Sequence, residues 1–284
     1  MHKLPRIVLI GCQNVAPQSV YALLNGNVPV EVVLVSEFSG SLMDEVQELV
    51  YQHPLGSKSR ARVGSAADLN ESEICILAST KQPKVKETEE SFVLRNIMAV
   101  SRKGKLLLKH DFAGILVVTI TPAIEKMTAA AMKASGLPAS KVIGLGSNAP
   151  PNHRSTLNVT GSLATWCSAE GCSPEFIDSC HPDCPYFEGI LESFHNTQNV
   201  HFVSGMATCV MRICEAILSD EKAVLPVIAI LDTEHGATPR FANIPCVIGK
   251  RGIEMSVAKT KIANQTKRKR FTDHKKLTVN STSA

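Results

Sequence analysis

The stretch RIVLIGCQNVA, residues 6–16, is the part of the sequence that most clearly indicates the fold class. Its first five residues are mostly apolar, as is typical of a strand buried on both faces. Gly11 follows directly, and residues 14–24 then have the pattern of a helix. A strand, a glycine turn and a helix form the opening unit of a nucleotide-binding α/β domain.

The glycine turn departs from the usual G-x-G-x-x-G pattern. In that pattern the middle glycine lets the backbone approach a pyrophosphate closely. Gln13 stands in place of the middle glycine, and Ala16 in place of the third. The sequence therefore predicts the scaffold of a dinucleotide site with an altered phosphate cradle.

Strand and helix patterns alternate through the first half of the chain. The predicted strands are 6–10, 31–36, 60–63, 74–78, 115–119 and 141–143. The predicted helices are 14–24, 41–52, 89–103 and 123–135. This alternation predicts an α/β fold with a doubly wound parallel sheet.

The pattern changes near Asn148. Residues 149–200 are rich in Pro, Cys, Ser and Asn and have weak periodicity. A helix at 204–219, antiparallel strands at 224–231 and 240–248, and a basic terminal helix from about 254 are the elements predicted beyond that segment.

The composition is that of an ordinary globular protein. Of the 284 residues, 44% are hydrophobic and 20% charged, and no apolar run reaches the ~18 residues of a membrane span. Neither a signal peptide nor a disulfide framework is indicated, because the nine cysteines are odd in number and several lie in predicted helices and strands. We expect a cytoplasmic protein with reduced thiols and no membrane contact.

The positive charge is concentrated at the C-terminal end. Residues 259–276 carry a net +7, and the whole chain carries +4, so the remainder carries −3. The run Lys267–Arg270 fits a solvated helix face, a nuclear import signal or a patch for an acidic partner. Because no aromatic residue lies within the run Lys267–Arg270, we expect no specific nucleic-acid binding.

Four spaced stretches resemble the lactate/malate dehydrogenase family over nearly the whole chain. They are the opening strand with Gly11, FVLRN (Phe92–Asn96), SGLPASKVIGLGSN (Ser135–Asn148) and NIPCVIGKRGIE (Asn243–Glu254). The resemblance implies a Rossmann-type NAD-binding domain over 1–145. It also implies an α+β C-terminal domain over 146–284 that supplies much of a keto-acid substrate site.

The cofactor positions that the resemblance implies are partly altered. They fall on Gly11, Gln13, Ala16, Ser36, Glu37 and Asn96. The family's acidic residue for the adenosine ribose aligns with Ser36, and Glu37 is the neighbour that could compensate after a shift of one residue. Since Gln13 adds a side chain in the cradle, we expect NAD to bind weakly or not at all.

The catalytic positions that the resemblance implies are changed throughout. The proton donor aligns with Gly171 and its partner carboxylate with Pro150. The substrate arginine aligns with His153, one residue before Arg154, and the arginine of the closing loop aligns with Glu89. The first interpretation is a catalytically inactive homologue without a small-molecule substrate. The second is an active NAD-dependent 2-hydroxy-acid dehydrogenase with rebuilt catalytic residues.

A cluster of potential metal ligands lies in the weakly patterned segment. It comprises Cys167, Cys172, Cys180, His181 and Cys184. The cysteine spacings are not those of a common zinc finger. We therefore expect unconstrained reduced thiols and no metal site, with a structural metal site or a redox pair as the alternatives.

The resemblance also implies an oligomeric state. Malate-type members of the family form dimers through helices of the Rossmann domain. Only five residues precede the first strand, which leaves no room for the N-terminal arm that lactate-type tetramers exchange. We therefore expect a homodimer.

Overall fold

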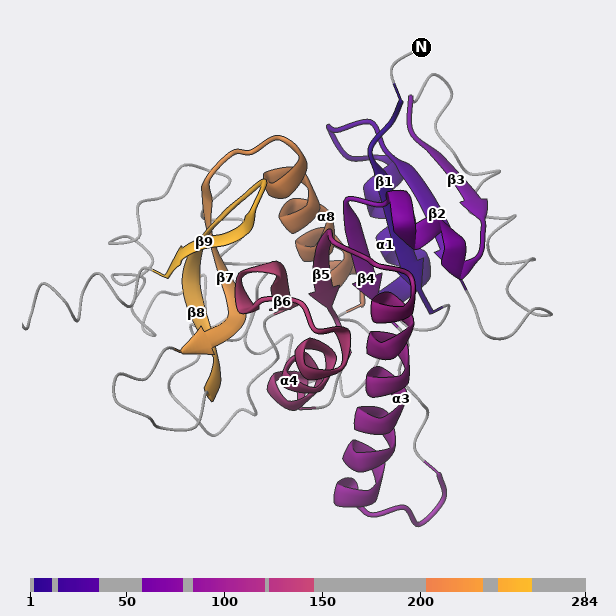
Figure 1. The fold of residues 1–284 in the computed structure, drawn as a ribbon, viewed down its shortest axis with the longest axis vertical. Helices are drawn as coiled ribbons and strands as arrows, with labels where there is room; N and C mark the ends of the chain where they lie inside the picture. The colour runs from indigo at the N-terminus through magenta and orange to yellow at the C-terminus, as the bar shows by residue number, and fades with distance from the viewer. Residues whose placement is uncertain are drawn as a thin grey trace, which may run out of the picture.

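A computed structural model describes residues 3–11, 15–35, 58–78, 84–120, 123–145, 203–231 and 240–256. The strands in these residues form one sheet in the order β3-β2-β1-β4-β5-β6-β7-β8-β9, shown in Figure 1. The α/β fold class predicted from the sequence is confirmed.

Six strands form the parallel part of the sheet. They are β1 (Arg6–Ile10), β2 (Glu31–Val35), β3 (Arg60–Val63), β4 (Ile74–Leu77), β5 (Ile115–Val118) and β6 (Val142–Leu145). Each corresponds to a predicted strand within a few residues. The order β3-β2-β1-β4-β5-β6 is that of a Rossmann-type sheet.

Three antiparallel strands continue the same sheet. They are β7 (Ala223–Leu231), β8 (Arg240–Gly249) and β9 (Gly252–Ser256). The predicted start of a terminal helix near 254 is wrong, because the turn after Gly249 returns the chain along β8 and pairs Met255 with Val247. This pairing satisfies the backbone groups of β8 that would otherwise stay open at the sheet edge. Residues 257–284, including the rest of the predicted terminal helix, lie outside the described residues.

Helices cover both faces of the sheet. The α-helices of the described residues are α1 (Val15–Leu24), α3 (Glu89–Lys109), α4 (Ile124–Ser135) and α8 (Val203–Leu218). The predicted helix at 41–52 lies outside the described residues. Along each central strand, alternate side chains point to opposite faces. Ile7 and Ile76 pack with α1 and α8 in one core, while Val8 and Leu77 pack with α3 and α4 in the other.

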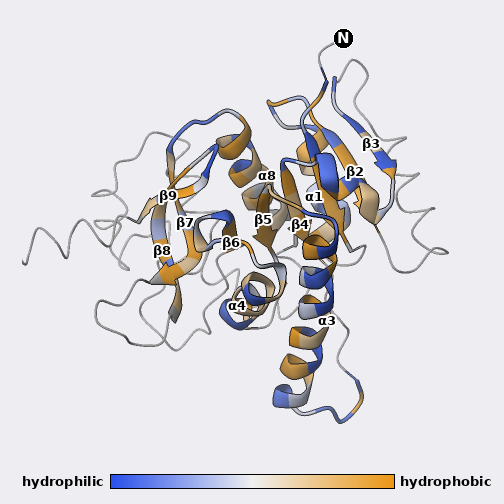
Figure 2. Ribbon diagram, viewed as in Figure 1, coloured by the Kyte–Doolittle hydropathy of each residue, from blue (hydrophilic) through white to orange (hydrophobic). Residues whose placement is uncertain are grey.

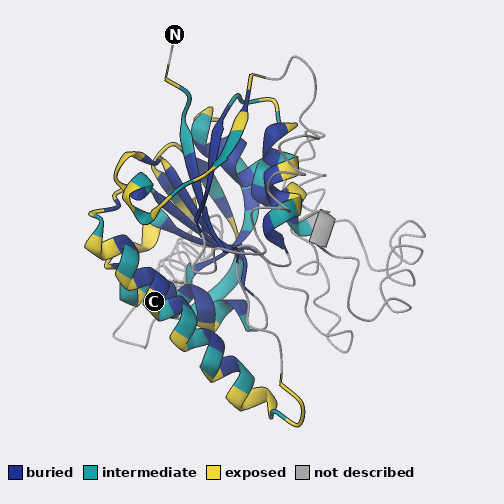
Figure 3. Ribbon diagram, turned by 90° about the vertical axis from the view of Figure 1, so that its right-hand side faces the viewer, coloured by how far each residue is buried: buried dark blue, intermediate teal, exposed yellow. Residues whose placement is uncertain are grey.

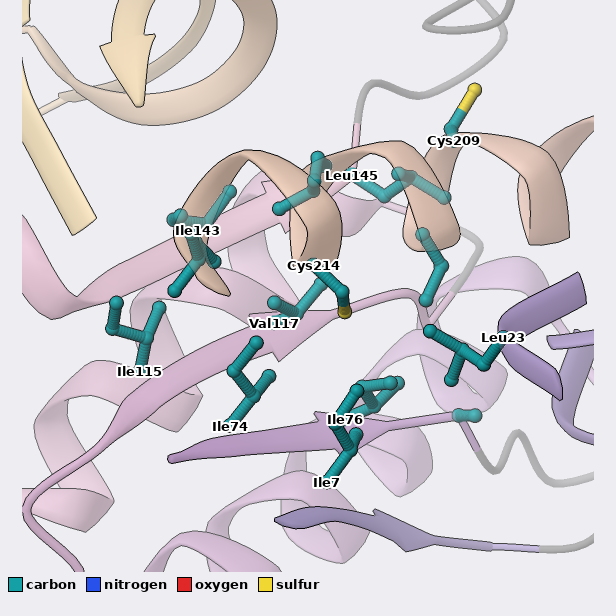
Figure 4. Packing of buried hydrophobic residues seen from close by; sticks show 14 of the residues in the cluster. Ile7, Leu23, Ile74, Ile76, Ile115, Val117, Ile143, Leu145, Cys209 and Cys214 are labelled. Atoms are coloured by element: carbon teal, nitrogen blue, oxygen red, sulfur yellow. The ribbon is translucent and has the colours of Figure 1, made fainter. Parts of the chain in front are cut away.

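The core under α8 is made from distant parts of the chain. Figure 4 shows Cys214 of α8 pointing toward Val117 and the neighbouring strands, with Leu23 of α1 beside them. Figure 2 shows the apolar strands between the more polar outer surfaces of the helices. At the end of α1, the backbone N–H of Asn27 donates to Glu215 Oε1 of α8 at 2.7 Å. α8 therefore completes one face of the Rossmann-type sheet.

The N-terminal and C-terminal halves meet within one sheet. β6 and β7 pair through Gly144 and Ile228, across the expected boundary between residues 145 and 146. The two-domain division at that boundary stays a prediction. No helix in the described ranges is long and apolar enough to cross a membrane.

The helix α3 runs six residues beyond its predicted end at 103. Thr88 caps its start, its Oγ1 accepting from the N–H of Ser91 at 3.3 Å. Gly104 does not end the helix, because it lies against α4, where an added Cβ would come within 2.6 Å of Ala134 Cβ. A glycine here permits close packing of the two helices. At the end of α4, Gly136 (φ 70°) adopts the left-handed conformation that commonly ends a helix.

A charge network joins the amino ends of the first three strands. Arg6, Glu31 and Arg60 stand in register on β1, β2 and β3. Glu31 is 4% exposed, and it accepts from Arg6 Nε at 2.7 Å and from Arg60 Nη2 at 2.9 Å. Burial alone would raise the pKa of Glu31, but the hydrogen bonds and charges of the arginines more than offset it and hold the pKa below its usual value. This network lies at the amino ends of the strands, opposite their carboxyl ends.

Two of the stretches that carry the family resemblance contact each other. Gly252, in the turn that opens β9, has φ 91°, a conformation that side-chain-bearing residues rarely adopt. Its Cα faces the carbonyl oxygen of Ser140, in the 3-10 turn η2 (Ala139–Lys141) before β6. An added Cβ would lie closer to that oxygen than real Cβ atoms come. Glycine is therefore required both for the turn and for this contact.

We expect Gly252→Ala to destabilise the protein more than Gly136→Ala. Positive φ costs an alanine roughly 1–2 kcal/mol at either position. At Gly136 the nearest atom to an added Cβ is Leu108 Cδ1 at 3.6 Å, so only this cost applies. At Gly252 the clash with Ser140 adds to it, and we expect a further loss of about 1–3 kcal/mol. Urea unfolding of both variants measures the difference, and equal losses would contradict the contact.

Candidate nucleotide-binding site

The chain adds successive strands to the sheet first on one side of β1 and then on the other, so the side changes between β1 and β4. From β1 it proceeds outward to β2 and β3, and it then returns to β4 on the other side of β1. In sheets of this kind ligands bind outside the carboxyl ends of the strands at such a switch point. The residues that follow these ends are Gly11 after β1 and Ala78 after β4. This edge is therefore the candidate site.

Backbone hydrogen bonds hold this edge together. The N–H of Gly11 donates to the carbonyl oxygen of Val35 at 3.0 Å, and the N–H of Ala78 donates to that of Ile10 at 3.2 Å. Thr119, 2% exposed after β5, donates from Oγ1 to the carbonyl oxygen of Leu77 at 3.0 Å. The ends of β1, β2, β4 and β5 are thus tied into one rigid edge.

The described part of the cradle fits a dinucleotide turn. Gly11 has φ 121°, a backbone conformation that glycine adopts far more readily than other residues. Ala16 is fully buried in α1, and its methyl group packs in the core shared with β1, which is the role of the third glycine of the pattern. Gln13, Ser36 and Glu37 lie outside the described residues. The described part of the turn therefore has the backbone and packing of a dinucleotide-binding turn. Whether NAD fits depends on the chemistry of Gln13, Ser36 and Glu37.

Asn96 is buried within α3. It is 1% exposed, and its Nδ2 donates to the carbonyl oxygen of Phe92 one turn earlier at 2.9 Å. One of its amide hydrogens is therefore used within the helix. Its predicted role in cofactor binding stays a prediction.

Glu89 is exposed at the first position of α3. The partial positive charge of a helix amino end favours a carboxylate there. The residue is thus well placed for helix stability, and it presents negative charge where the resemblance implies an arginine.

An ion pair fixes the turn that leads into α3. Glu87 accepts from Arg95 Nε at 2.8 Å, from Arg95 Nη2 at 2.6 Å and from the backbone N–H of Lys84 at 2.9 Å. These bonds lower the pKa of Glu87 to about 2, the hydrogen bonds from Arg95 being the largest cause. The Arg95 guanidinium also lies over the ring of Phe92, 5.6 Å from its centroid. Sequence reasoning missed this arrangement, although the eight-residue spacing across a helix start is visible.

The remaining predicted site residues lie outside the described residues. They are the catalytic positions Gly171, Pro150 and His153 and the cluster Cys167, Cys172, Cys180, His181 and Cys184. The part of the chain that the structure describes contains no group of three potential metal ligands. Its cysteines, Cys75, Cys209, Cys214 and Cys246, form no disulfide and are buried. Burial raises the pKa of Cys246 to about 12 and also raises those of Cys75 and Cys214.

A family model and curated relatives resemble this chain. Residues 202–281 match the model of the lactate/malate dehydrogenase α/β C-terminal domain. L-lactate dehydrogenase 2 of Enterococcus faecalis is 26% identical and covers 87% of this chain and 87% of its own length. L-lactate dehydrogenase 2 of Peribacillus psychrosaccharolyticus is 27% identical and covers 94% of this chain and 92% of its own length. The similarity therefore extends through both halves.

Solved structures share the fold. The minor L-lactate dehydrogenase of Enterococcus mundtii, in a ligand-bound form, superposes with a TM-score of 0.71 at 21% identity over 89% of this chain and 90% of its own. The lactate dehydrogenase of Cryptosporidium parvum, complexed with lactic acid and NAD, superposes at 0.68 with 18% identity over 90% of both chains. The match of residues 202–281 to the C-terminal domain model, the nearly full-length relatives and the strand order together support membership of the lactate/malate dehydrogenase family.

Proposed function

We propose that this chain is a lactate/malate dehydrogenase-like protein that does not reduce keto acids and binds NAD weakly or not at all. The observation that carries the proposal is the joint replacement of the family's reaction residues. Gly171 and Pro150 cannot donate or orient a proton, and Glu89 has the wrong charge for a keto acid. A cytoplasmic location accompanies the proposal, and the four described cysteines, which form no disulfide, support it.

The chemistry explains why these replacements act together. When hydride reaches a carbonyl carbon, the carbonyl oxygen becomes an alkoxide that needs a proton or a nearby cation. A glycine supplies neither. A carboxylate at Glu89 would oppose the developing negative charge and raise the barrier.

His153 and Arg154 are the remaining candidates for the missing roles. They come from the segment that should hold the substrate carboxylate. One residue cannot hold that carboxylate and also protonate the carbonyl, because the two groups lie on different sides of the substrate. His153 or Arg154 alone therefore replaces at most one of the lost functions.

Arg95 does not supply the missing cation. It is close in sequence to the loop that should close over the substrate, but Glu87 engages it through two hydrogen bonds. Its charge is thereby balanced next to the helix start, and its guanidinium is held over Phe92.

The alternative function is an active NAD-dependent 2-hydroxy-acid dehydrogenase with rebuilt catalytic residues. The observation that favours it is that relatives named L-lactate dehydrogenase align over nearly their whole length. The two functions differ in the rate at which NADH is oxidised in the presence of a keto acid, which can be measured directly.

We expect Glu87→Gln to lower stability at neutral pH and to lose its effect in acid. The folded pKa of about 2 lies below the ordinary value of 4.5, so Glu87 stabilises the folded state above about pH 5. That contribution is lost as the pH falls from 4.5 toward 2. Urea midpoints of wild type and Glu87→Gln should therefore converge on acidification. Glu89→Gln, which removes a carboxylate from the same helix start, is the control, and an equal pH-dependent change there would contradict a specific role for Arg95.

We expect wild-type protein to show no tight NADH binding when its fluorescence is titrated. Trp166, the single tryptophan, provides the signal. Gln13→Gly combined with Ser36→Asp should tighten binding roughly tenfold to a hundredfold, because a carboxylate accepts from the ribose hydroxyls more strongly than a hydroxyl does. Gln13→Gly with Ser36→Asn is the neutral control. Low-micromolar binding by the wild type would refute the proposed loss of affinity.

We expect no reduction of pyruvate, oxaloacetate or similar keto acids above background with NADH or NADPH. Absorbance of the reduced cofactor follows the reaction. A reproducible rate that disappears in His153→Ala or Arg154→Ala would show that catalysis had been rebuilt there, and the alternative function would then hold.

A further inference from the structure

The edge strand β3 buries few apolar side chains. Arg60 and Val63, at its two ends, are exposed, and Ala61 and Arg62 between them are only partly buried. All five residues of the neighbouring strand β2 are buried. Figure 3, in which this side of the molecule faces the viewer, shows the more exposed edge of the sheet beside the buried central strands. Burial of apolar surface therefore contributes little to holding β3 on the sheet.

Two arginines of β3 contact a buried carboxylate of β2. Arg60 Nη2 lies 2.9 Å from Glu31 Oε1, and Arg62 Nε lies 3.3 Å from the same oxygen. Only 5% of the Glu31 side chain is exposed, so salt and water screen these pairs less than they screen surface pairs. Backbone pairing and these charges together hold β3 against β2.

A second carboxylate contacts β3 from the 3-10 helix η1 (Ala66–Glu71). This short helix is anchored by Leu69, which is fully buried in the core. Asp68 of η1 pairs with Arg62, and it also accepts from the backbone N–H of Ser65 at 2.9 Å, in the turn after β3. Arg62 therefore lies between two carboxylates whose own elements are anchored in the fold.

We propose that β3 is a charge-held edge strand that separates from β2 ahead of the rest of the sheet when acid neutralises Glu31 and Asp68. Neutral carboxyls would leave Arg60 and Arg62 uncompensated near Arg6 of β1, and like charges so close repel. Elements with few buried apolar contacts commonly open at a lower free energy than the whole molecule. Once β3 has separated, β2 becomes the edge of the sheet and presents unpaired backbone groups.

The direction of the pH effect follows from the pKa of each carboxyl. Burial raises the pKa of Glu31, but the arginines lower it by more, and the hydrogen bond from Arg62 is the largest cause that lowers the pKa of Asp68. A carboxyl with a lowered folded pKa stabilises the folded state above its ordinary pKa, and this contribution is lost as the pH falls through the folded value. β3 should therefore be held at neutral pH and released below about pH 4.

The surrounding groups favour the same direction. The helix α1, which also packs against β2 and β3, carries no carboxyl, amine or guanidinium group. Glu71 has a lowered pKa, chiefly because of its hydrogen bond from Lys3, so it too is neutralised only in acid. The charged groups around Glu31 and Asp68 are Lys3, Arg6, Arg60, Arg62, Glu71 and Glu73.

Hydrogen exchange measured by mass spectrometry on the intact chain tests the proposal. Protection factors, corrected for the intrinsic effect of pH, should fall for β3 roughly tenfold or more between about pH 7 and about pH 3.5, before those of β5 change. β5 is the reference because all four of its residues are buried within the sheet. Equal loss of protection in β3 and β5, or unchanged protection in β3, would overturn the proposal.

Arg62→Met tests the role of charge at neutral pH. Methionine keeps an unbranched apolar stem but removes both ion pairs, so protection of β3 should fall roughly tenfold while that of β5 stays unchanged. Val63→Thr is the matched control on the same strand, because threonine keeps the branched shape of this exposed side chain and should change protection by less than about threefold. Circular dichroism confirms that both variants are folded. An effect of Val63→Thr as large as that of Arg62→Met, or no effect of Arg62→Met, would show that charge does not hold β3.

Discussion

The central constraint on this structure is that the parallel strands other than the edge strand β3 are mostly apolar on both faces and must be covered on both. α3 and α4 cover one face and follow the strands closely in sequence. The other face is covered by α1 together with α8, which comes from the far side of a long segment. The bond from Asn27 to Glu215 and the pairing of β6 with β7 join the same parts. The Rossmann-type sheet is therefore not complete without C-terminal residues.

Much of the fold could be predicted from local sequence. Short runs of Val, Ile and Leu identified the parallel strands because such strands are buried on both faces. Contacts between distant residues could not be predicted in this way. The extension of α3 past Gly104 depends on its contact with Ala134, and β9 depends on pairing with β8. The partners of Glu31 likewise become evident only once the register of three strands is known.

The candidate site likewise has features that local sequence predicts and features that it does not. The geometry of the turn calls for a glycine after β1 and a small residue at position 16, and Gly11 has a positive φ while Ala16 is buried. Two other features depend on side-chain conformations that spacing alone does not specify. They are the hydrogen bond of Asn96 within α3 and the pairing of Glu87 with Arg95. The contact between Gly252 and Ser140 joins two of the stretches that carry the family resemblance. Two stretches that carry the family resemblance act in packing, so this part of the fold does not depend on which residues occupy the candidate catalytic positions.

The position of α8 in the chain has a consequence for biosynthesis. The last residue of α8 is made roughly 70 residues after the end of β6. At about 5–20 residues per second, synthesis of that interval takes on the order of 4 to 14 seconds. During that time the sheet face that α8 will cover has no complete partner on the nascent chain. The emerging polypeptide thus carries a transient apolar surface of the kind that chaperones bind, and its production is sensitive to the speed of translation through this interval.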